Sequence, residues 1–204
     1  MTKTVIKTIA FTLVGVLVLA GVLFVCFLLF SPKTLGNVSR AMGNSSAAVC
    51  FYERQYNKTK SADDLTVLVF AIDEKKNPDK AEQYTDELIE KFDEYLLLDR
   101  CDFSTDADTN AAAAKEYFYA KSSVGALYNK GLTAAIEKAM TYIVSNGYTK
   151  SNALRIIIST EGDNLTAENL AELKAALITA KTYSDSPLID GDIAAIDKLL
   201  TEKN

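Results

Sequence analysis

Carboxylates are the main groups in this sequence that could perform chemistry, because the 204 residues include 27 Asp and Glu but no His. His is the commonest general base and the commonest metal ligand. Its absence excludes Ser-His-Asp and Cys-His nucleophile arrangements and every zinc site with a His ligand. An enzyme of this sequence would have to work with carboxylates, Lys, Tyr or Ser alone. We therefore expect a protein that is not an enzyme.

One acidic segment begins like a calcium-binding loop. In Asp106-Ala-Asp108-Thr-Asn110, side chains with oxygen ligands alternate as such a loop requires. However, the sixth position is Ala111, where the sharp turn needs Gly, and the twelfth is Tyr117, where a bidentate Glu belongs. We interpret the segment as a polar loop that caps the following helix, and we expect no metal and no cofactor.

Cysteine is too sparse to build a disulfide scaffold or a metal site. Cys26 lies in an apolar run, and Cys50 and Cys101 are far apart in the rest of the chain. A single bridge between Cys50 and Cys101 would require an oxidising compartment. The alternative is that both are small, buried apolar groups on helices, and the sequence leaves the two open.

The charge of the chain argues against nucleic acid as a partner. The first thirty residues contain two Lys and no Asp or Glu, so the remainder has 20 basic and 27 acidic residues, a net charge of −7. An acidic domain repels phosphate backbones and, as a whole, does not adsorb flat on anionic lipid. No Gly-rich phosphate loop is present, and no small-molecule substrate is evident.

The segment from Thr8 to Phe30 is a predicted membrane anchor. It contains twenty-three residues without a charge, and about 20 apolar residues in a helix span a bilayer. The run is too long for a secretory signal and ends without a small-x-small cleavage site. Lys3 and Lys7 in the short tail favour a cytoplasmic N-terminus. We expect a single-pass protein of the cell membrane that contacts the lipid bilayer through residues 8–30, with an extracytoplasmic C-terminal domain.

The rest of the chain has the capping residues and the apolar spacing of an all-α domain. Ser-Pro and Asn-Pro pairs open two of the expected helices, and the segment 151–159 fits a helix or a buried strand, of which we favour the helix. The expected helices are 31–42, 45–58, 61–72, 78–98, 111–129, 132–145, 151–159, 166–183 and 190–202. We divide the chain into residues 1–30, 31–100 and 101–204.

Two helix pairs in the middle part repeat at a period of 33 residues. This offset aligns Ala48 with Ala81 and Phe51 with Tyr84. A period in the low thirties with paired helices is typical of a repeat array, or α-solenoid.

The first of these pairs carries a family pattern. It has Leu35-Gly36 in its first helix, Gly43-Asn44 at the turn, and then Ala48 with Phe51-Tyr52-Glu53. With these residues the chain resembles the tetratricopeptide repeat (TPR) family over about residues 31–95. Residues 101–204 are then a degenerate helical repeat or a helical cap.

The resemblance implies a concave groove, lined by the first helix of each pair, that binds peptides or partner proteins. Carried over position by position, the groove would be lined by Lys33, Asn37, Arg40, Ala41, Thr66, Phe70, Asp73 and Glu74.

The sequence therefore predicts a non-catalytic, membrane-tethered scaffold or adaptor that holds a protein partner in a TPR-like groove. Two alternatives stay open. The first is a structural subunit of a membrane complex, and the second is a carboxylate-based binder or hydrolase acting on cell-envelope polymer. An apolar or mixed-charge groove would favour protein binding, and paired carboxylates in a deep pocket would favour chemistry.

Overall fold

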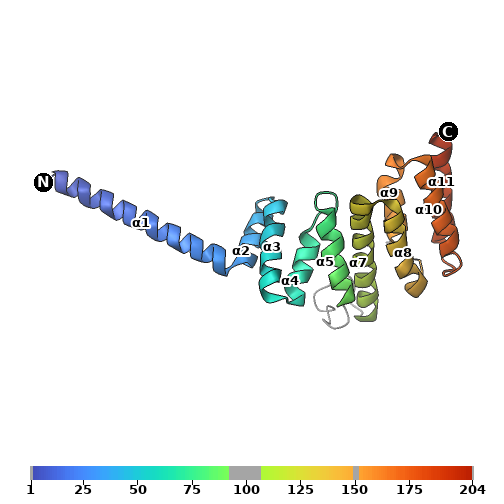
Figure 1. Ribbon diagram of the computed structural model, residues 1–204, viewed down its shortest axis with the longest axis horizontal. Coiled ribbons are helices and arrows are strands. Elements are labelled where there is room, and N and C mark those ends of the chain that lie inside the picture. The colour runs from blue at the N-terminus through green and yellow to red at the C-terminus, as the bar shows by residue number, and fades with distance from the viewer. Residues whose placement is uncertain (1, 92–106, 149–151, 204) are drawn as a thin grey trace. The chain divides into compact units, whose positions relative to one another are not determined.

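The computed structural model describes the backbone of residues 2–91, 107–148 and 152–203 (Figure 1). Side chains are described in these ranges except at 2–8, 10, 27–30 and 107–109. The described residues form ten α-helices and one short 3₁₀ helix and contain no strand. The all-α prediction is confirmed.

The chain divides into two compact units, an N-terminal unit of residues 1–64 and a C-terminal unit of residues 65–204. The division at 1–30, 31–100 and 101–204 that the sequence predicts stays a prediction. Cys101 lies outside the described residues, so the choice between a Cys50–Cys101 bridge and two unbridged Cys stays open. The predicted continuation of a helix from 92 to 98 also lies outside the described residues.

The N-terminal unit contains α1 (Thr2–Phe30), α2 (Pro32–Ala41) and α3 (Ser45–Thr59). Pro32 opens α2 behind Ser31, and Asn44 caps α3 by accepting a hydrogen bond of 3.1 Å from the Ala47 amide. Helix α3 therefore begins after Asn44, where the sequence predicts the end of the turn that follows α2.

Gly36 lets α2 and α3 approach closely. A Cβ atom at this position would lie 2.4 Å from the ring of Tyr52, which is fully buried on α3. Ala48, also on α3, is buried as well. These are the two positions at which the sequence pattern requires small residues.

The large apolar side chains along α1 from Phe11 to Val25 are exposed. Among the residues whose side chains are described, which in α1 are Ile9 and Phe11 to Cys26, no helix combines the length and the apolar character needed to cross a membrane.

In the C-terminal unit α7 packs on α5, α8 and α9, and α10 packs on α8 and α11 (Figure 1). The unit boundary falls inside α4, and a turn separates α9 from α10. The bounds of these helices are α4 Ala62–Ala71, α5 Pro78–Glu90, α7 Ala107–Lys130, α8 Leu132–Asn146, α9 Ala153–Glu161, η2 Gly162–Asn164, α10 Ala167–Ala180 and α11 Leu188–Lys203.

Several predicted boundaries need correction. Helix α7 begins at Ala107 instead of Ala111, so the end of the calcium-like segment is helical backbone. Helix α10 ends at Ala180 instead of Tyr183, and α11 begins at Leu188 instead of Asp190. The segment around 153–161 is a helix, which settles the choice between helix and buried strand. Asn152 caps it by accepting from the Leu154 amide at 3.0 Å.

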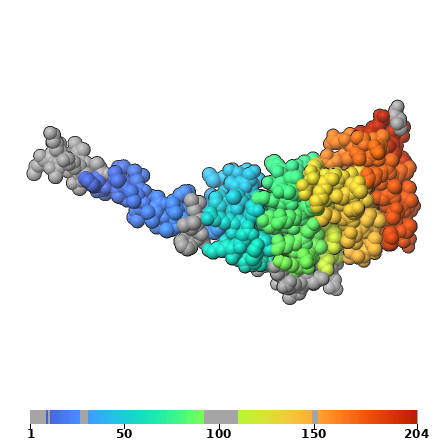
Figure 2. Space-filling view, in the orientation of Figure 1, coloured from blue at the N-terminus to red at the C-terminus, as the bar shows by residue number. Residues whose placement is uncertain are grey.

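The core of the C-terminal unit lies among α8, α9, α10 and α11 and contains mostly aliphatic side chains. Its fully buried Leu and Ile residues are Ile143, Leu154, Ile157, Leu170, Leu173, Leu177, Ile189 and Ile196. In Figure 2 the yellow-green to red atoms, which belong to the part of the chain that contains α7 to α11, form one continuous surface. This packing fixes α7 and α9, the helices that carry the candidate site.

Candidate peptide-binding groove

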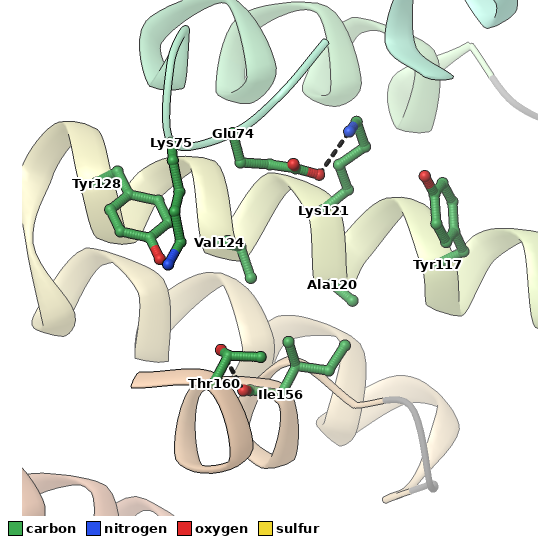
Figure 3. Close-up of a pocket in the computed structure, with 9 residues that line it drawn as sticks. All are labelled: Glu74, Lys75, Tyr117, Ala120, Lys121, Val124, Tyr128, Ile156 and Thr160. Carbon is green, nitrogen blue, oxygen red and sulfur yellow. Dashed lines mark hydrogen bonds and ion pairs between the residues drawn. The ribbon is translucent and has the colours of Figure 1, made fainter. Parts of the chain in front are cut away.

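The C-terminal unit contains a surface pocket of about 290 Å³ between α7, α9 and the turn that follows α4 (Figure 3). Its floor is mainly apolar and its edges carry charged and aromatic side chains. The pocket is lined by Glu74, Lys75, Tyr117, Ala120, Lys121, Val124, Tyr128, Ile156 and Thr160.

Helix α7 supplies most of the lining. Tyr117, Lys121, Val124 and Tyr128 are spaced by four, three and four residues, so they share one face of the helix. Another face of α7 packs against α5 through Gly125, where a Cβ would lie 2.9 Å from the backbone nitrogen of Glu82. The contact with α5 therefore fixes how α7 is turned about its own axis. In this orientation the four side chains face the pocket.

Aromatic side chains lie at both ends of the pocket in Figure 3. The ring of Tyr117 stacks on Phe70 of α4, with 5.2 Å between the ring centroids and 26° between the planes. At the other end, the Lys75 ammonium lies 5.4 Å from the ring centroid of Tyr128. Stacked rings and a cation over a ring face both hold side chains in fixed positions without closing the apolar floor.

A buried cation forms one wall of the pocket. The Lys121 ammonium donates to the carbonyl oxygen of Ile72 at 2.7 Å and pairs with the carboxylate of Glu74. In Figure 3 these two side chains extend toward one another across the pocket edge. The pair neutralises a charge that burial would otherwise disfavour.

A second charged cluster joins the turn after α4 to α7 and α9. Glu161 on α9 pairs with Lys75 and accepts from the Tyr128 hydroxyl. The Lys75 ammonium and the Tyr128 hydroxyl hold the pKa of Glu161 below its ordinary value, although burial acts in the opposite direction. Burial and the Glu161 carboxylate raise the pKa of Tyr128. Glu161 is thus an ionised acceptor and a poor proton donor near neutral pH.

Two other carboxylates, which lie outside the pocket, also have pKa values below the ordinary value. Burial alone would raise the pKa of Glu82, but hydrogen bonds from Lys130 at 2.7 Å and Asn129 at 2.9 Å outweigh it and lower the pKa. In the N-terminal unit, Asp64 also has a lowered pKa. Burial raises the pKa of Asp64, but hydrogen bonds, among them those from Thr59 and Lys33, lower this pKa by more.

These shifts predict how stability depends on pH. A carboxyl with a lower pKa in the folded state stabilises the fold above its unfolded pKa, and this contribution is lost as pH falls through the folded pKa. Because the chain has no His, we expect a nearly constant free energy of unfolding between about pH 6 and 8 and a decline below about pH 4.5. Denaturant unfolding at a series of pH values would measure this. Glu161→Gln should make the acid decline shallower, and a steep change near pH 7 would contradict the prediction.

The predicted groove residues of the N-terminal unit have different surroundings. Lys33 forms an ion pair with Asp64 at 3.0 Å, and Asn37 accepts a hydrogen bond of 2.8 Å from the Tyr52 hydroxyl. Arg40 is exposed near the end of α2.

The predicted residues of the second pair are only partly brought together. Phe70 contacts Tyr117, and Glu74 lines the pocket. Asp73 accepts from the backbone amides of two following residues and so shapes the turn. Thr66 is 4% exposed and its side chain lies in the interior. The groove assignment as a whole stays a prediction.

The residues that sequence reasoning misses come from α7 and α9. An aromatic stripe at helical spacing usually packs inside, so the sequence favours a core position for Tyr117 and Tyr119, which flank Phe118, and makes no prediction for Tyr128. The spacing of Tyr117 and Tyr128 with Lys121 on one helical face is the available signal, because a Lys on an otherwise apolar stripe requires either an acceptor or access to water.

The arrangement is suited to recognition. Among the described residues, no group of three or more Cys, Asp or Glu side chains could hold a metal ion. The pocket's carboxylate, Glu74, is occupied by an ion pair. Fold and site together define an all-helical protein whose helices pack in sequential pairs, with a pocket of mixed apolar and charged character in its C-terminal unit. Comparison of the chain with protein-family models, curated proteins and solved structures finds no match.

Proposed function

We propose that this protein is a membrane-tethered interaction module whose groove on α7 and α9 binds a segment of a partner protein. The observation that carries this proposal is the pocket itself. It offers the apolar surface of Ala120, Val124 and Ile156 between the charged side chains of Glu74 and Lys121. Binding sites commonly combine an apolar floor with a few fixed polar groups, which set the orientation of the ligand.

The charges of the pocket favour a peptide over a charged small molecule. Lys75 and Lys121 are each paired with a carboxylate, so the pocket presents balanced charge to a ligand. A mixed-charge rim around an apolar floor is typical of protein interfaces. Because Glu74 and Glu161 are committed to ion pairs, neither is placed to act as an acid or base, and we propose a function without catalysis.

The TPR-like interpretation rests on the helix pairs. Gly36 on α2 allows the close approach of α3, and Ala48 and Ala81 are both buried at equivalent positions of the 33-residue period. In such an arrangement the first helix of each pair lines the groove. Helix α7 is followed by its partner α8 across the turn at Gly131, so α7 would be a first helix, as its role in the pocket requires.

We also propose that α1 tethers the protein to the cell membrane, with the helical units on the extracytoplasmic side. This proposal is supported by the twenty-three uncharged residues from Thr8 to Phe30 and by the basic residues Lys3 and Lys7 before them.

The test is site-specific photocrosslinking of the full-length protein in intact membranes. A photoreactive phenylalanine derivative would replace Tyr117 or Tyr128, which line the pocket, and Tyr183, which is exposed beyond α10, would be replaced as the control. We expect one discrete crosslinked partner at both pocket positions and no such product at position 183. The proposal would be wrong if all three positions gave the same products, or if the pocket positions gave none.

A further inference from the structure

Helix α2 exposes an apolar face that no neighbouring helix covers in the described residues. Val38 is 49% exposed and Met42 is 79% exposed, and Ala41 between them is also exposed. Arg40 lies at the edge of this face and makes no ion pair in the described part of the chain. Exposed apolar side chains next to a cation are the composition of a helix that lies at a membrane surface.

The charge of the chain is divided unevenly along its length. Residues 31–64 contain five basic and three acidic residues, a net charge of +2, and no Asp or Glu occurs before Glu53. Residues 65–204 contain 15 basic and 24 acidic residues, a net charge of −9. Only the N-terminal unit is therefore electrostatically complementary to an anionic surface, although the chain as a whole is acidic.

The position of α2 in the chain brings this face close to the proposed anchor. Helix α2 begins at Pro32, two residues after α1 ends at Phe30. At 1.5 Å per residue, the ten residues of α2 extend only about 15 Å. With α1 in a bilayer, Val38 and Met42 are within reach of the lipid headgroups.

We propose that the Val38–Met42 face of α2 docks on anionic lipid headgroups at the membrane surface, with the two apolar side chains inserted among them and Arg40 paired with lipid phosphate. This inference rests on the proposed membrane placement of α1. Docking would orient the N-terminal unit on the bilayer, while the charge of −9 on residues 65–204 keeps the C-terminal unit from adsorbing to the same surface.

The chain contains no Trp, so one introduced Trp is a selective reporter. The full-length Met42→Trp variant would be reconstituted into vesicles of phosphatidylcholine alone or with phosphatidylglycerol, each with and without brominated acyl chains. The matched control is Ile178→Trp on α10, where the native side chain is 53% exposed. Flotation of the vesicles first establishes that each variant is bound.

In phosphatidylglycerol vesicles we expect the emission of the Met42→Trp variant to shift to shorter wavelength and to be quenched by brominated lipid, whereas the emission of the Ile178→Trp variant should not change. Adding Arg40→Gln to Met42→Trp removes one charge near the surface and should lower the ratio of docked to undocked α2 about fivefold. Vesicles of phosphatidylcholine alone should give a similar reduction for the single variant.

The outcomes separate this inference from the tether. Failure of both Trp variants to float with the vesicles would refute the placement of α1 and the docking with it. Flotation with equal quenching at positions 42 and 178 would refute the docking alone. Absence of quenching at position 42 in protein-free vesicles, together with a crosslink from a photoreactive residue at position 42 to a protein in native membranes, would identify a protein as the occupant of this face and would overturn the lipid assignment.

Discussion

Gly125→Ala will destabilise the C-terminal unit by about 2 kcal/mol, although Ala is the better helix former. An added Cβ would lie 2.9 Å from the backbone nitrogen of Glu82 and 3.2 Å from the Cβ of Ala81. Because backbone atoms of α5 cannot rotate away as a flexible side chain can, overpacking should cost up to about 3 kcal/mol. The gain in helix propensity returns only about 1 kcal/mol. Denaturant unfolding monitored by circular dichroism would measure the difference.

The matched control for this substitution is Gly191→Ala on α11. No heavy atom lies within 4 Å of the Cβ that this change would add. The propensity effect should therefore appear alone and stabilise the protein by up to about 1 kcal/mol. Equal effects at Gly125 and Gly191 would mean that α5 and α7 are not in the close contact described above.

The consequence for the groove follows from the position of Gly125 on α7. It lies between Val124 and Tyr128, which face the pocket, and it holds α7 against α5 from another side. Displacing α7 to admit a methyl group moves the pocket face as well. We therefore expect Gly125→Ala to weaken partner crosslinking at Tyr117, and Gly191→Ala to leave it unchanged.

The helical architecture could be predicted from local signals. Pro32 and Pro78 lie at the start of α2 and α5 as the sequence indicates, although neither Ser31 nor Asn77 makes a side-chain cap hydrogen bond. Thr166 caps α10 by accepting from the Asn169 amide at 3.1 Å. These signals involve neighbouring residues, so a single sequence contains them in full. The start of α7 could not be predicted in this way, because the residues from Ala107 to Asn110 have the composition of a polar loop, while in the structure they continue the helix.

The pocket could be predicted only in part, because it depends on contacts between distant segments. The repeat pattern identifies Glu74 as a groove residue. Its partner Lys121 is 47 residues away, in a helix whose sequence no longer matches the repeat pattern clearly. Gly125 and its neighbour Glu82 are similarly remote in sequence. Helical spacing shows which residues share a face of α7. It does not show which face meets α5 and which remains open.

Glu74→Ala will destabilise the protein by more than its partial exposure suggests, by about 2 kcal/mol. The side chain of Glu74 is 28% exposed, whereas that of its partner Lys121 is 4% exposed. Removing the carboxylate leaves the Lys121 ammonium buried with the Ile72 carbonyl as its remaining acceptor at 2.7 Å. A buried charge without its counterion costs more than the ion pair contributes when both are present.

The double variant Glu74→Leu, Lys121→Met should recover most of that loss, to within about 1 kcal/mol of the parent, because replacing both charges leaves neither one buried alone. Denaturant unfolding of the parent, Glu74→Ala and the double variant measures the recovery, and a double variant less stable than Glu74→Ala would contradict the argument.

The double variant also gives a folded groove without this ion pair. If the partner still crosslinks at Tyr117 in that background, the apolar floor carries recognition. If crosslinking is lost while the fold is retained, the partner interacts with the charged groups of Glu74 and Lys121. The ion pair then has a role in binding as well as in stability.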